Sequence, residues 1–326
     1  MRLLMKKRIK QSDMKLVIGI PTFNRSKYLI QNLKNIETIC EETHHFDDVT
    51  VFISDNCSTD DTVEKISVFK KTSHLNIDVN FNTINKGISN NLVFILQEGS
   101  NKGDFLLLLG DDDLFSKEYF ITAINLINKY QPACVLPNYL PTDNNYKIIG
   151  EPREPISDEP IVSSSLESNL RLSFLCHQMS GVIYNCAFWS KDFVFPMQTS
   201  MYPQIYLGIL LSDKGTFIHI QNNPILVIQN NSKAWKYDSA GYSIDILSGL
   251  YYVNVPKGKY FKLCRDFLNN NRWRLSFGIK HPIKFWKVVL GEKRVRPCVK
   301  VFLFFYMPLV AAKTFLRMIF KKRKKQ

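Results

Sequence analysis

Short apolar runs alternate with amphipathic stretches over the first 130 residues of the chain. Each apolar run ends in a group of polar residues, which is typical of a buried strand that leads into a turn. The stretches between the runs repeat apolar residues at helical spacing, which predicts helices. The predicted strands begin at Lys15, Val49, Ile77 and Phe105. Helices are predicted at 28–39 and 92–98, and between them a further helix that Ser58 or Thr59 would cap.

This alternation of strands and helices predicts an α/β fold with a mainly parallel, Rossmann-like sheet flanked by helices. In open sheets of this kind the ligand lies at the carboxyl ends of the strands, and the polar groups that follow the predicted strands would converge there. The chain has 326 residues with 45% hydrophobic content, enough to bury a full core.

The most informative polar group is the run of Asp111, Asp112 and Asp113, which directly follows the apolar stretch 105–109. Adjacent carboxylates resist ionising together, and a divalent cation removes that penalty. Oxygen ligands suit Mg²⁺ or Mn²⁺, and such ions commonly hold the phosphates of a substrate. The alternative interpretation of the run is a solvated acidic turn or the start of a helix.

Four motifs between Lys15 and Tyr130 resemble those of the nucleotide-sugar-dependent glycosyltransferases of family 2, whose fold is called GT-A. They occur in the family order, and they are residues 20–25 (Ile-Pro-Thr-Phe-Asn-Arg), 54–56 (Ser-Asp-Asn), 85–87 (Asn-Lys-Gly) and 111–113 (Asp-Asp-Asp). The resemblance implies a GT-A catalytic domain, a nucleoside-diphosphate-sugar donor and a Mg²⁺ or Mn²⁺ cofactor.

The resemblance also implies which carboxylates bind the metal ion. Asp112 would ligate a cation that bridges the diphosphate, and Asp111 and Asp113 would complete the ribose and metal contacts. The usual family pattern has an Asp two residues before the metal ligand, where this chain has Gly110. A subset of the family shares this Gly-Asp-Asp-Asp form, and the assignment of each carboxylate to ribose or to metal stays open.

By the same resemblance, Thr22 and Phe23 would flank the nucleobase, and Asp55 would accept a hydrogen bond from it. The other candidates for binding the donor are Pro21, Arg25, Asn85, Lys86 and Gly87. From the residues alone, Asp55 could instead cap a turn, the 85–87 segment could be an ordinary turn, and Arg25 could lie in solvent.

The middle of the chain predicts the acceptor half of the site. Residues 131–165 are rich in proline and predict loops, and a helix near 166–176, a core strand at 181–185 and a helix with Pro203 in its first turn follow. Many family members place a catalytic Asp at the start of that last helix, where this chain has Gln204. An amide cannot act as a general base, so another carboxylate is needed.

Asp192 is the candidate general base, with Asp213 and Asp158 as alternatives. The candidates for the acceptor pocket are Tyr202, Gln204, His177 and Trp235, although Trp235 could equally belong to the core. The Gln-x-x-Arg-Trp motif of processive synthases is missing from the sequence, which favours the addition of a single sugar.

Positive charge is concentrated at the C-terminal end of the chain. Residues 1–254 carry 23 Lys and Arg against 27 Asp and Glu, whereas residues 255–326 carry 20 against 2. The basic residues interleave with large apolar ones, which fits binding to an anionic membrane surface better than binding to nucleic acid. The longest uncharged run, 301–312, would span about 18 Å as a helix, well short of a bilayer's hydrocarbon core, and Pro308 interrupts it. The alternatives are a re-entrant hairpin and a helix packed on the catalytic domain.

These patterns predict a basic extension at 1–13, a catalytic domain at 14–254 with its donor half at 14–130 and its acceptor half at 131–254, and a membrane-associated helical tail at 255–326. The seven cysteines show neither close pairing nor zinc-site spacing, which favours a reducing compartment and no cofactor beyond the cation. The apolar residues near the N-terminus are too few for a secretory signal. We therefore expect a cytoplasmic protein, peripheral on the inner face of the cytoplasmic membrane.

The function that these observations favour is the transfer of one sugar from a nucleoside-diphosphate sugar to a hydroxyl of a lipid-linked oligosaccharide. The reaction would be metal-dependent and inverting, in the assembly of O-antigen, capsule or exopolysaccharide. Two alternatives stay open, a nucleotidyltransferase that makes sugar nucleotides and a non-catalytic protein that binds membranes or nucleic acid. The first is disfavoured because the chain has no Gly-rich, basic phosphate loop after its first strand.

Overall fold

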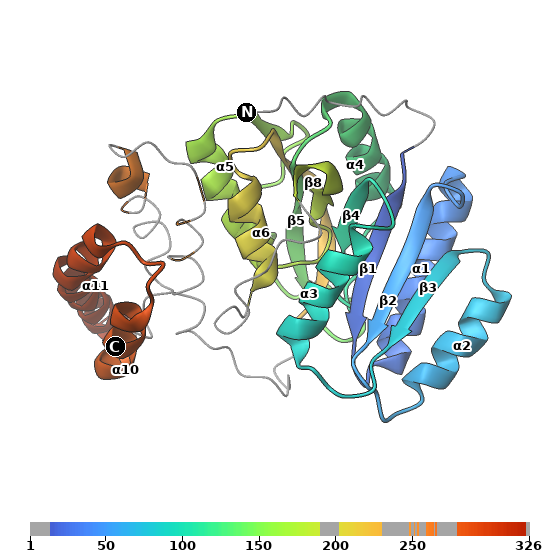
Figure 1. The fold of residues 1–326 in the computed structure, drawn as a ribbon, viewed down its shortest axis with the longest axis horizontal. Coiled ribbons are helices and arrows are strands. Elements are labelled where there is room, and N and C mark those ends of the chain that lie inside the picture. The colour runs from blue at the N-terminus through green and yellow to red at the C-terminus, as the bar shows by residue number, and fades with distance from the viewer. Residues whose placement is uncertain are drawn as a thin grey trace.

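The computed structural model describes residues 14–189, 202–229 and 279–323, with isolated positions between 248 and 265, and side chains of the last helix as far as residue 313. In this part of the chain, eight strands form one sheet (Figure 1). In spatial order they are β3 (Asn76–Phe81), β2 (Val49–Asp55), β1 (Leu16–Thr22), β4 (Phe105–Leu108), β7 (Ile183–Asn185), β5 (Cys134–Thr142), β8 (Phe217–Ile228) and β6 (Ile161–Ser163).

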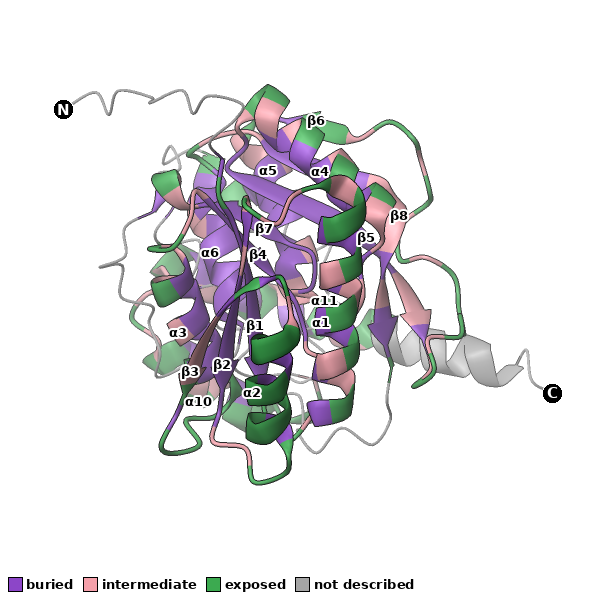
Figure 2. Ribbon diagram, turned by 90° about the vertical axis from the view of Figure 1, so that its right-hand side faces the viewer, coloured by how far each residue is buried: buried purple, intermediate pink, exposed green. Residues whose placement is uncertain are grey.

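The sheet is mixed but mainly parallel. Strands β1 to β4 run parallel to one another, β7 is antiparallel to both of its neighbours, and β8 is parallel to β5 and antiparallel to β6. The parallel strands β1, β2 and β4 are buried along nearly their whole length, as Figure 2 shows. Burial on both faces explains why these strands are continuous apolar runs in the sequence.

Helices cover both faces of the sheet and create two cores. The helices α1 (Ser26–Thr43), α2 (Thr62–Thr72) and α4 (Lys117–Tyr130) pack on one face, and α3 (Ile88–Gly99), α5 (Leu166–Ser173) and α6 (Pro203–Leu211) pack on the other. Successive side chains of a strand point to opposite faces. Along β1, Ile18 therefore belongs to the first core, while its neighbour Val17 belongs to the second.

The close contact between α3 and β1 depends on a glycine. A Cβ atom at Gly19 would lie 2.5 Å from Cγ2 of Ile95 and 3.2 Å from Cδ1 of Leu106. Both distances are below ordinary van der Waals separation, so the absence of a side chain at position 19 lets α3 lie against the strand that carries the first motif.

The predicted elements are present, with differences at their ends. Helix α1 begins two residues earlier than predicted, and α3 begins at Ile88. The prediction that Ser58 or Thr59 caps α2 was wrong, because this helix begins at Thr62, whose N–H donates to Oδ1 of Asp60 (3.0 Å). Ser58 and Thr59 instead bind Asp55 and Asn24, as described below.

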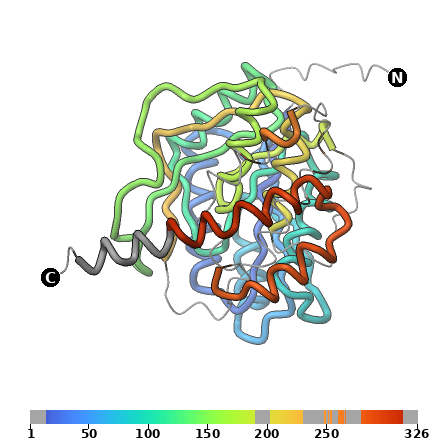
Figure 3. The backbone as a smooth tube through the Cα atoms, turned by 90° about the vertical axis from the view of Figure 1, so that its left-hand side faces the viewer, coloured from blue at the N-terminus to red at the C-terminus, as the bar shows by residue number. Residues whose placement is uncertain are grey.

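Two helices of the basic C-terminal region, α10 (Pro282–Gly291) and α11 (Pro297–Arg323), lie side by side (Figure 3) at one edge of the molecule (Figure 1). Pro308 lies inside α11, which continues through it. One side of this pair, including Phe285, Val289 and Leu303, belongs to the same core as α3 and α6. In the described part of the chain, no helix combines the length and the apolar character that a membrane crossing requires.

Candidate active site

The loops after β1 and β2 are joined by hydrogen bonds that hold the first two motifs together. The N–H of Asn24 donates to Oγ of Ser58 (2.8 Å), and Oδ1 of Asn24 accepts from the N–H of Thr59 (2.7 Å). Asn24 adopts the left-handed conformation, with φ of 52°, which Asn tolerates better than most residues. Phe23, at the tip of this turn, keeps an exposed side chain.

Asp55 ends β2 and is almost fully buried. One of its carboxylate oxygens accepts from the N–H of Ser58 (2.9 Å), and the other accepts from the Ser58 hydroxyl (2.5 Å). The structure therefore shows the turn-capping arrangement that the sequence left open. Each carboxylate oxygen has two lone pairs, so this arrangement still leaves acceptor capacity for a ligand.

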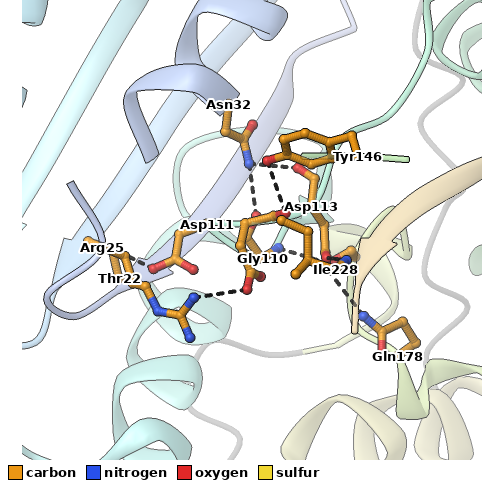
Figure 4. A network of polar contacts seen from close by, with 11 residues as sticks. Thr22, Arg25, Asn32, Gly110, Asp111, Asp113, Tyr146, Gln178 and Ile228 are labelled. Atoms are coloured by element: carbon orange, nitrogen blue, oxygen red, sulfur yellow. Dashed lines mark hydrogen bonds and ion pairs between the residues drawn. The ribbon is translucent and has the colours of Figure 1, made fainter. Parts of the chain in front are cut away.

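The loop after β4 places the first two aspartates against the β1 loop (Figure 4). The Thr22 hydroxyl donates to Oδ2 of Asp111 (2.8 Å), and Nη1 of Arg25 lies 3.2 Å from Oδ2 of Asp112. Burial raises the pKa of Asp111 to about 7, and the charge of Asp112 adds to this effect. The hydrogen bond from Thr22 and the charge of Arg25 oppose the rise without cancelling it. Ionising Asp111 beside Asp112 is therefore unfavourable unless further positive charge is brought to the site.

Asp113 faces the interior of the protein. Its carboxylate accepts hydrogen bonds from the Ser180 hydroxyl, from Nε2 of Gln178 (3.1 Å) and from the N–H of Ile228 (3.2 Å). These bonds join the aspartate loop to the segment before β7 and to the end of β8. The metal role predicted for Asp113 stays a prediction, and this geometry favours Asp112 over it.

The same geometry gives a reason for Gly110. A Cβ atom at this position would lie 2.9 Å from Oδ2 of Asp113 and 3.1 Å from Oγ of Ser180. The backbone here is also fixed by Asn32, whose Nδ2 donates to the carbonyl oxygens of Gly110 (2.8 Å) and Asp113 (2.9 Å). The space that an Asp would need at position 110 is occupied by the buried Asp113 carboxylate.

The 85–87 segment forms an ordered loop before α3. Oδ1 of Asn85 accepts from Nδ2 of Asn56 and from the N–H of Gly87 (both 2.9 Å), and Gly87 has φ of 77°, which favours glycine. Nζ of Lys86 donates to Oδ1 of Asn82 (2.7 Å). The same Nζ lies 5.3 Å from the centroid of the Phe94 ring, and neither this ring nor the Asn82 amide carries a negative charge.

The acceptor candidates that the structure describes lie together at the start of α6. The rings of His177 and Tyr202 are 5.2 Å apart, and Nε2 of Gln204 donates to the His177 carbonyl (3.4 Å). The main-chain oxygen of Gln204 accepts from the hydroxyl of Tyr184 (2.7 Å), and its side chain is buried. Gln204 is therefore held by His177 and Tyr184 at the start of α6.

Two of the base candidates, Asp213 and Asp158, are not brought together with this group. Asp213 lies beyond the other end of α6 and pairs with Lys214 (3.4 Å), and Asp158 is exposed in a loop before β6. Asp192 and Trp235 lie outside the described residues.

The aspartate loop is contacted by side chains that the sequence did not single out, those of Asn32, Tyr146, Gln178 and Ser180. Tyr146 adopts the left-handed conformation, with φ of 59°, and its hydroxyl donates to the main-chain oxygen of Asp112 (3.2 Å), as Figure 4 shows. No local pattern marks these residues, because each comes from a segment far from residues 110–113 in sequence.

The sequence profile described as "Glycosyl transferase family 2" matches residues 17–193, more than half of the chain. The chain belongs to this family. It is therefore a glycosyltransferase, and the family and enzyme class predicted from the four motifs are confirmed. The matched region contains nearly all of β1, the whole of β2 to β7 and all four motifs.

The chain is also similar to a curated protein and to solved structures. The abequosyltransferase RfbV of Salmonella typhimurium is 25% identical over 270 residues, which cover 77% of this chain and 78% of that protein. The structure of S. aureus TarS residues 1–349 with UDP-GlcNAc matches at a TM-score of 0.68 and 16% identity, covering 96% of this chain and 93% of that one. The mannosyltransferase PcManGT of Pyrobaculum calidifontis, in complex with GDP-Man and Mn²⁺, matches at a TM-score of 0.50 and 12% identity, covering 91% of this chain and 80% of that one. These structures confirm the GT-A fold.

The residues of the aspartate loop fit a divalent cation held jointly with a substrate. Among the described residues, no three His, Cys, Asp or Glu side chains are grouped so that they could hold a metal ion by themselves. Mg²⁺ commonly binds through one or two carboxylates together with substrate phosphates. The Asp112 carboxylate, with Asp111 beside it and Arg25 opposing its charge, matches this kind of site.

Proposed function

We propose that this enzyme transfers a single sugar from a nucleoside-diphosphate sugar to a hydroxyl of a lipid-linked oligosaccharide, during assembly of a surface polysaccharide such as O-antigen, capsule or exopolysaccharide. The relative named an abequosyltransferase and the neighbours solved with UDP-GlcNAc and GDP-Man support a sugar nucleotide as donor. The missing processive motif supports the addition of one sugar.

The observation that carries this proposal is the convergence of the β1 and β4 loops, in which Thr22 contacts Asp111 and Arg25 contacts Asp112. In the proposed complex, the exposed Phe23 and the Asp55 carboxylate bind the nucleobase, and Lys86 contributes positive charge toward the diphosphate. Pro21, Asn85 and Gly87 shape the backbone around the donor. Asp111 contacts the ribose.

Asp112 is the proposed ligand of a Mg²⁺ or Mn²⁺ ion. When bound, the cation would offset the negative charge that develops on the departing diphosphate. Arg25, which pairs with Asp112 in this structure, would supply positive charge to a phosphate oxygen of the donor. The neighbour in complex with Mn²⁺ supports this choice of metal.

We propose direct displacement at the anomeric carbon, which inverts its configuration. The acceptor hydroxyl forms the new bond, the bond from the anomeric carbon to the diphosphate oxygen breaks, and a carboxylate accepts the hydroxyl proton. Asp192 is the proposed base, because the side chain of Gln204 cannot take up a proton. His177, Tyr202 and Gln204 form the proposed acceptor side, with Trp235 as a stacking surface.

The proposed setting is the cytoplasm, with the protein held peripherally at the inner face of the cytoplasmic membrane. The excess of Lys and Arg in residues 255–326 supports an anionic membrane surface as partner, rather than nucleic acid, because large apolar residues interleave with these charges.

The test of the proposed donor site is calorimetric titration with UDP, GDP, CDP and dTDP, each with and without Mn²⁺. We expect the wild type to bind one of these nucleotides more tightly with Mn²⁺ than without it. Asp112→Ala should lose the part of the affinity that depends on Mn²⁺, because it removes the carboxylate that bridges the cation to the protein.

The matched control is Asp47→Ala, which removes an exposed carboxylate away from the site. It should bind as the wild type does. If the wild type bound none of the four nucleotides, or if Asp112→Ala bound Mn²⁺ and nucleotide unchanged, the proposal would be wrong.

A further inference from the structure

The exposed side of α10 and α11 carries large apolar side chains that the fold leaves in solvent. Ile283 is 86% exposed and Phe305 is 69% exposed. Such side chains are usually covered when several occur together on one surface. The exposed apolar residues of this surface, called the C-terminal face below, are Ile283, Leu290, Val301, Phe304, Phe305 and Leu309.

The spacing of these residues places them on one side of each helix. In α11, Val301, Phe305 and Leu309 recur every four residues, opposite the buried Val299, Leu303 and Met307. In α10, Ile283 and Leu290 are seven residues apart and lie opposite the buried Phe285 and Val289.

The two helices contact each other, so their exposed sides belong to one rigid pair. The rings of Trp286 and Phe304 are 6.0 Å apart, and Nζ of Lys300 donates to the carbonyl of Leu290 (2.8 Å). Figures 1 and 3 show the pair as the outermost layer on its side of the molecule.

The charge around the C-terminal face identifies the chemistry of its partner. Residues 279–313 contain eight Lys and Arg but a single acidic residue, Glu292, which pairs with Arg294. Lys284 and Lys287 are exposed on α10 beside Ile283 and Leu290. A surface that is both strongly basic and apolar is complementary to a bilayer with anionic headgroups and hydrocarbon beneath them.

Other occupants fit less well. A second copy related by two-fold symmetry would place the same basic surfaces against each other, which is electrostatically unfavourable. Nucleic acid would satisfy the lysines and arginines and leave the aliphatic side chains Ile283, Leu290 and Leu309 without a partner.

We infer that the C-terminal face is a membrane-docking surface, on which α10 and α11 lie parallel to an anionic bilayer and insert Ile283, Leu290, Phe304, Phe305 and Leu309 below the headgroups. This inference deepens the proposed function by naming the surface that holds the enzyme beside a lipid-linked acceptor. It does not depend on the metal or nucleotide site.

The test uses the full-length protein in co-sedimentation with vesicles of phosphatidylcholine, alone or mixed with phosphatidylglycerol, at low and high salt. The wild type should bind the mixed vesicles, bind them less at high salt, and bind pure phosphatidylcholine weakly. Ile283→Ser/Leu290→Ser should bind the mixed vesicles about tenfold more weakly, because two inserted aliphatic side chains are lost.

The control is Val68→Ser/Ile156→Ser, which removes two comparably exposed aliphatic side chains outside the C-terminal face and should bind as the wild type does. Thermal unfolding of both double variants should match the wild type, which separates lost docking from lost folding. Asp112→Ala should bind vesicles normally while losing Mn²⁺-dependent nucleotide binding, so failure of the docking surface and failure of the donor site can be told apart.

Three results would overturn the inference. The first is the absence of binding to the phosphatidylglycerol vesicles, and the second is unchanged binding of Ile283→Ser/Leu290→Ser. The third is self-association of the wild type in sedimentation velocity that this variant abolishes, which would assign the C-terminal face to a second copy of the chain.

Discussion

At the scale of single residues, the three adjacent aspartates occupy three different environments. Asp111 accepts from Thr22, Asp112 faces Arg25, and Asp113 is bound inside the protein. Two partners of Asp113, Gln178 and Ile228, are 65 and 115 residues away in sequence. The sequence could indicate that the three aspartates bind a cation together with substrate phosphates. Which aspartate faces the site and which faces the interior depends on these distant contacts.

Tyr146→Phe tests a residue that only the structure brings to the site. Loss of the hydroxyl removes the hydrogen bond to the main-chain oxygen of Asp112, which leaves this ligand less well positioned. We expect the Mn²⁺-dependent affinity for the bound nucleotide to fall by roughly threefold to tenfold, the value of one hydrogen bond, with little change in the free energy of unfolding. Calorimetry measures the first quantity and urea unfolding the second.

The control is Tyr130→Phe at an exposed tyrosine on α4. An equal loss of affinity in the presence and absence of Mn²⁺ would contradict a positioning role for Tyr146 at the metal ligand.

At the scale of elements, the strands β1 to β4 and their helices were predictable because their signals are local. A buried strand is a short apolar run, and an amphipathic helix repeats every three to four residues. The helix starts were less predictable, since Ser58 and Thr59 have the chemistry of caps but bind Asp55 and Asn24 instead. The choice between these partners is made by contacts between loops.

Gly19→Ala tests how closely α3 must approach β1. The added methyl group would overlap Cγ2 of Ile95, so α3 has to shift away from the sheet. We expect the free energy of unfolding in urea to fall by about 1–3 kcal/mol, the usual range for overpacking a core.

Gly291→Ala is the control, because a Cβ atom there meets nothing within 4 Å, and it should be neutral or slightly stabilising. In Gly19→Ala/Ile95→Ala the overlapping Cγ2 is absent, so the double variant should lose less stability than the sum of the losses of the two single variants. Equal stability of Gly19→Ala and the wild type would contradict the close packing.

At the scale of the whole molecule, two cores lie on the two faces of one sheet, and the C-terminal helices extend one of them. The charge pattern separated residues 255–326 from the rest of the chain. It could not show which apolar residues of α10 and α11 pack inward, because both sides of these helices carry large apolar side chains.

The stability of the folded molecule should depend on pH through His219, a buried residue of β8. Burial, together with the charge of Arg153, lowers its pKa to about 4, from an ordinary value of 6.5. Because the unfolded chain binds the proton more readily, the free energy of unfolding should fall as the pH drops from 6.5 toward 4, by up to about 3 kcal/mol from this residue.

Urea unfolding at pH 7, 5.5 and 4.5 measures this dependence. His219→Gln should lose less stability over this range than the wild type, and His74→Gln, at an exposed histidine, should behave as the wild type does. The same decrease in all three proteins would rule out His219 as its source.

The sequence by itself determined the α/β class, the order of the first strands and helices, and the placement of four polar motifs at strand ends, because each is expressed in local periodicity and in the residues that follow a strand. The tertiary structure alone decided that Asp113 faces inward, that Gly110 leaves room for it, and that Tyr146 reaches the main chain of Asp112. It also decided which side of α10 and α11 stays in solvent. These features arise from contacts between segments far apart in the chain, and such contacts leave no local pattern.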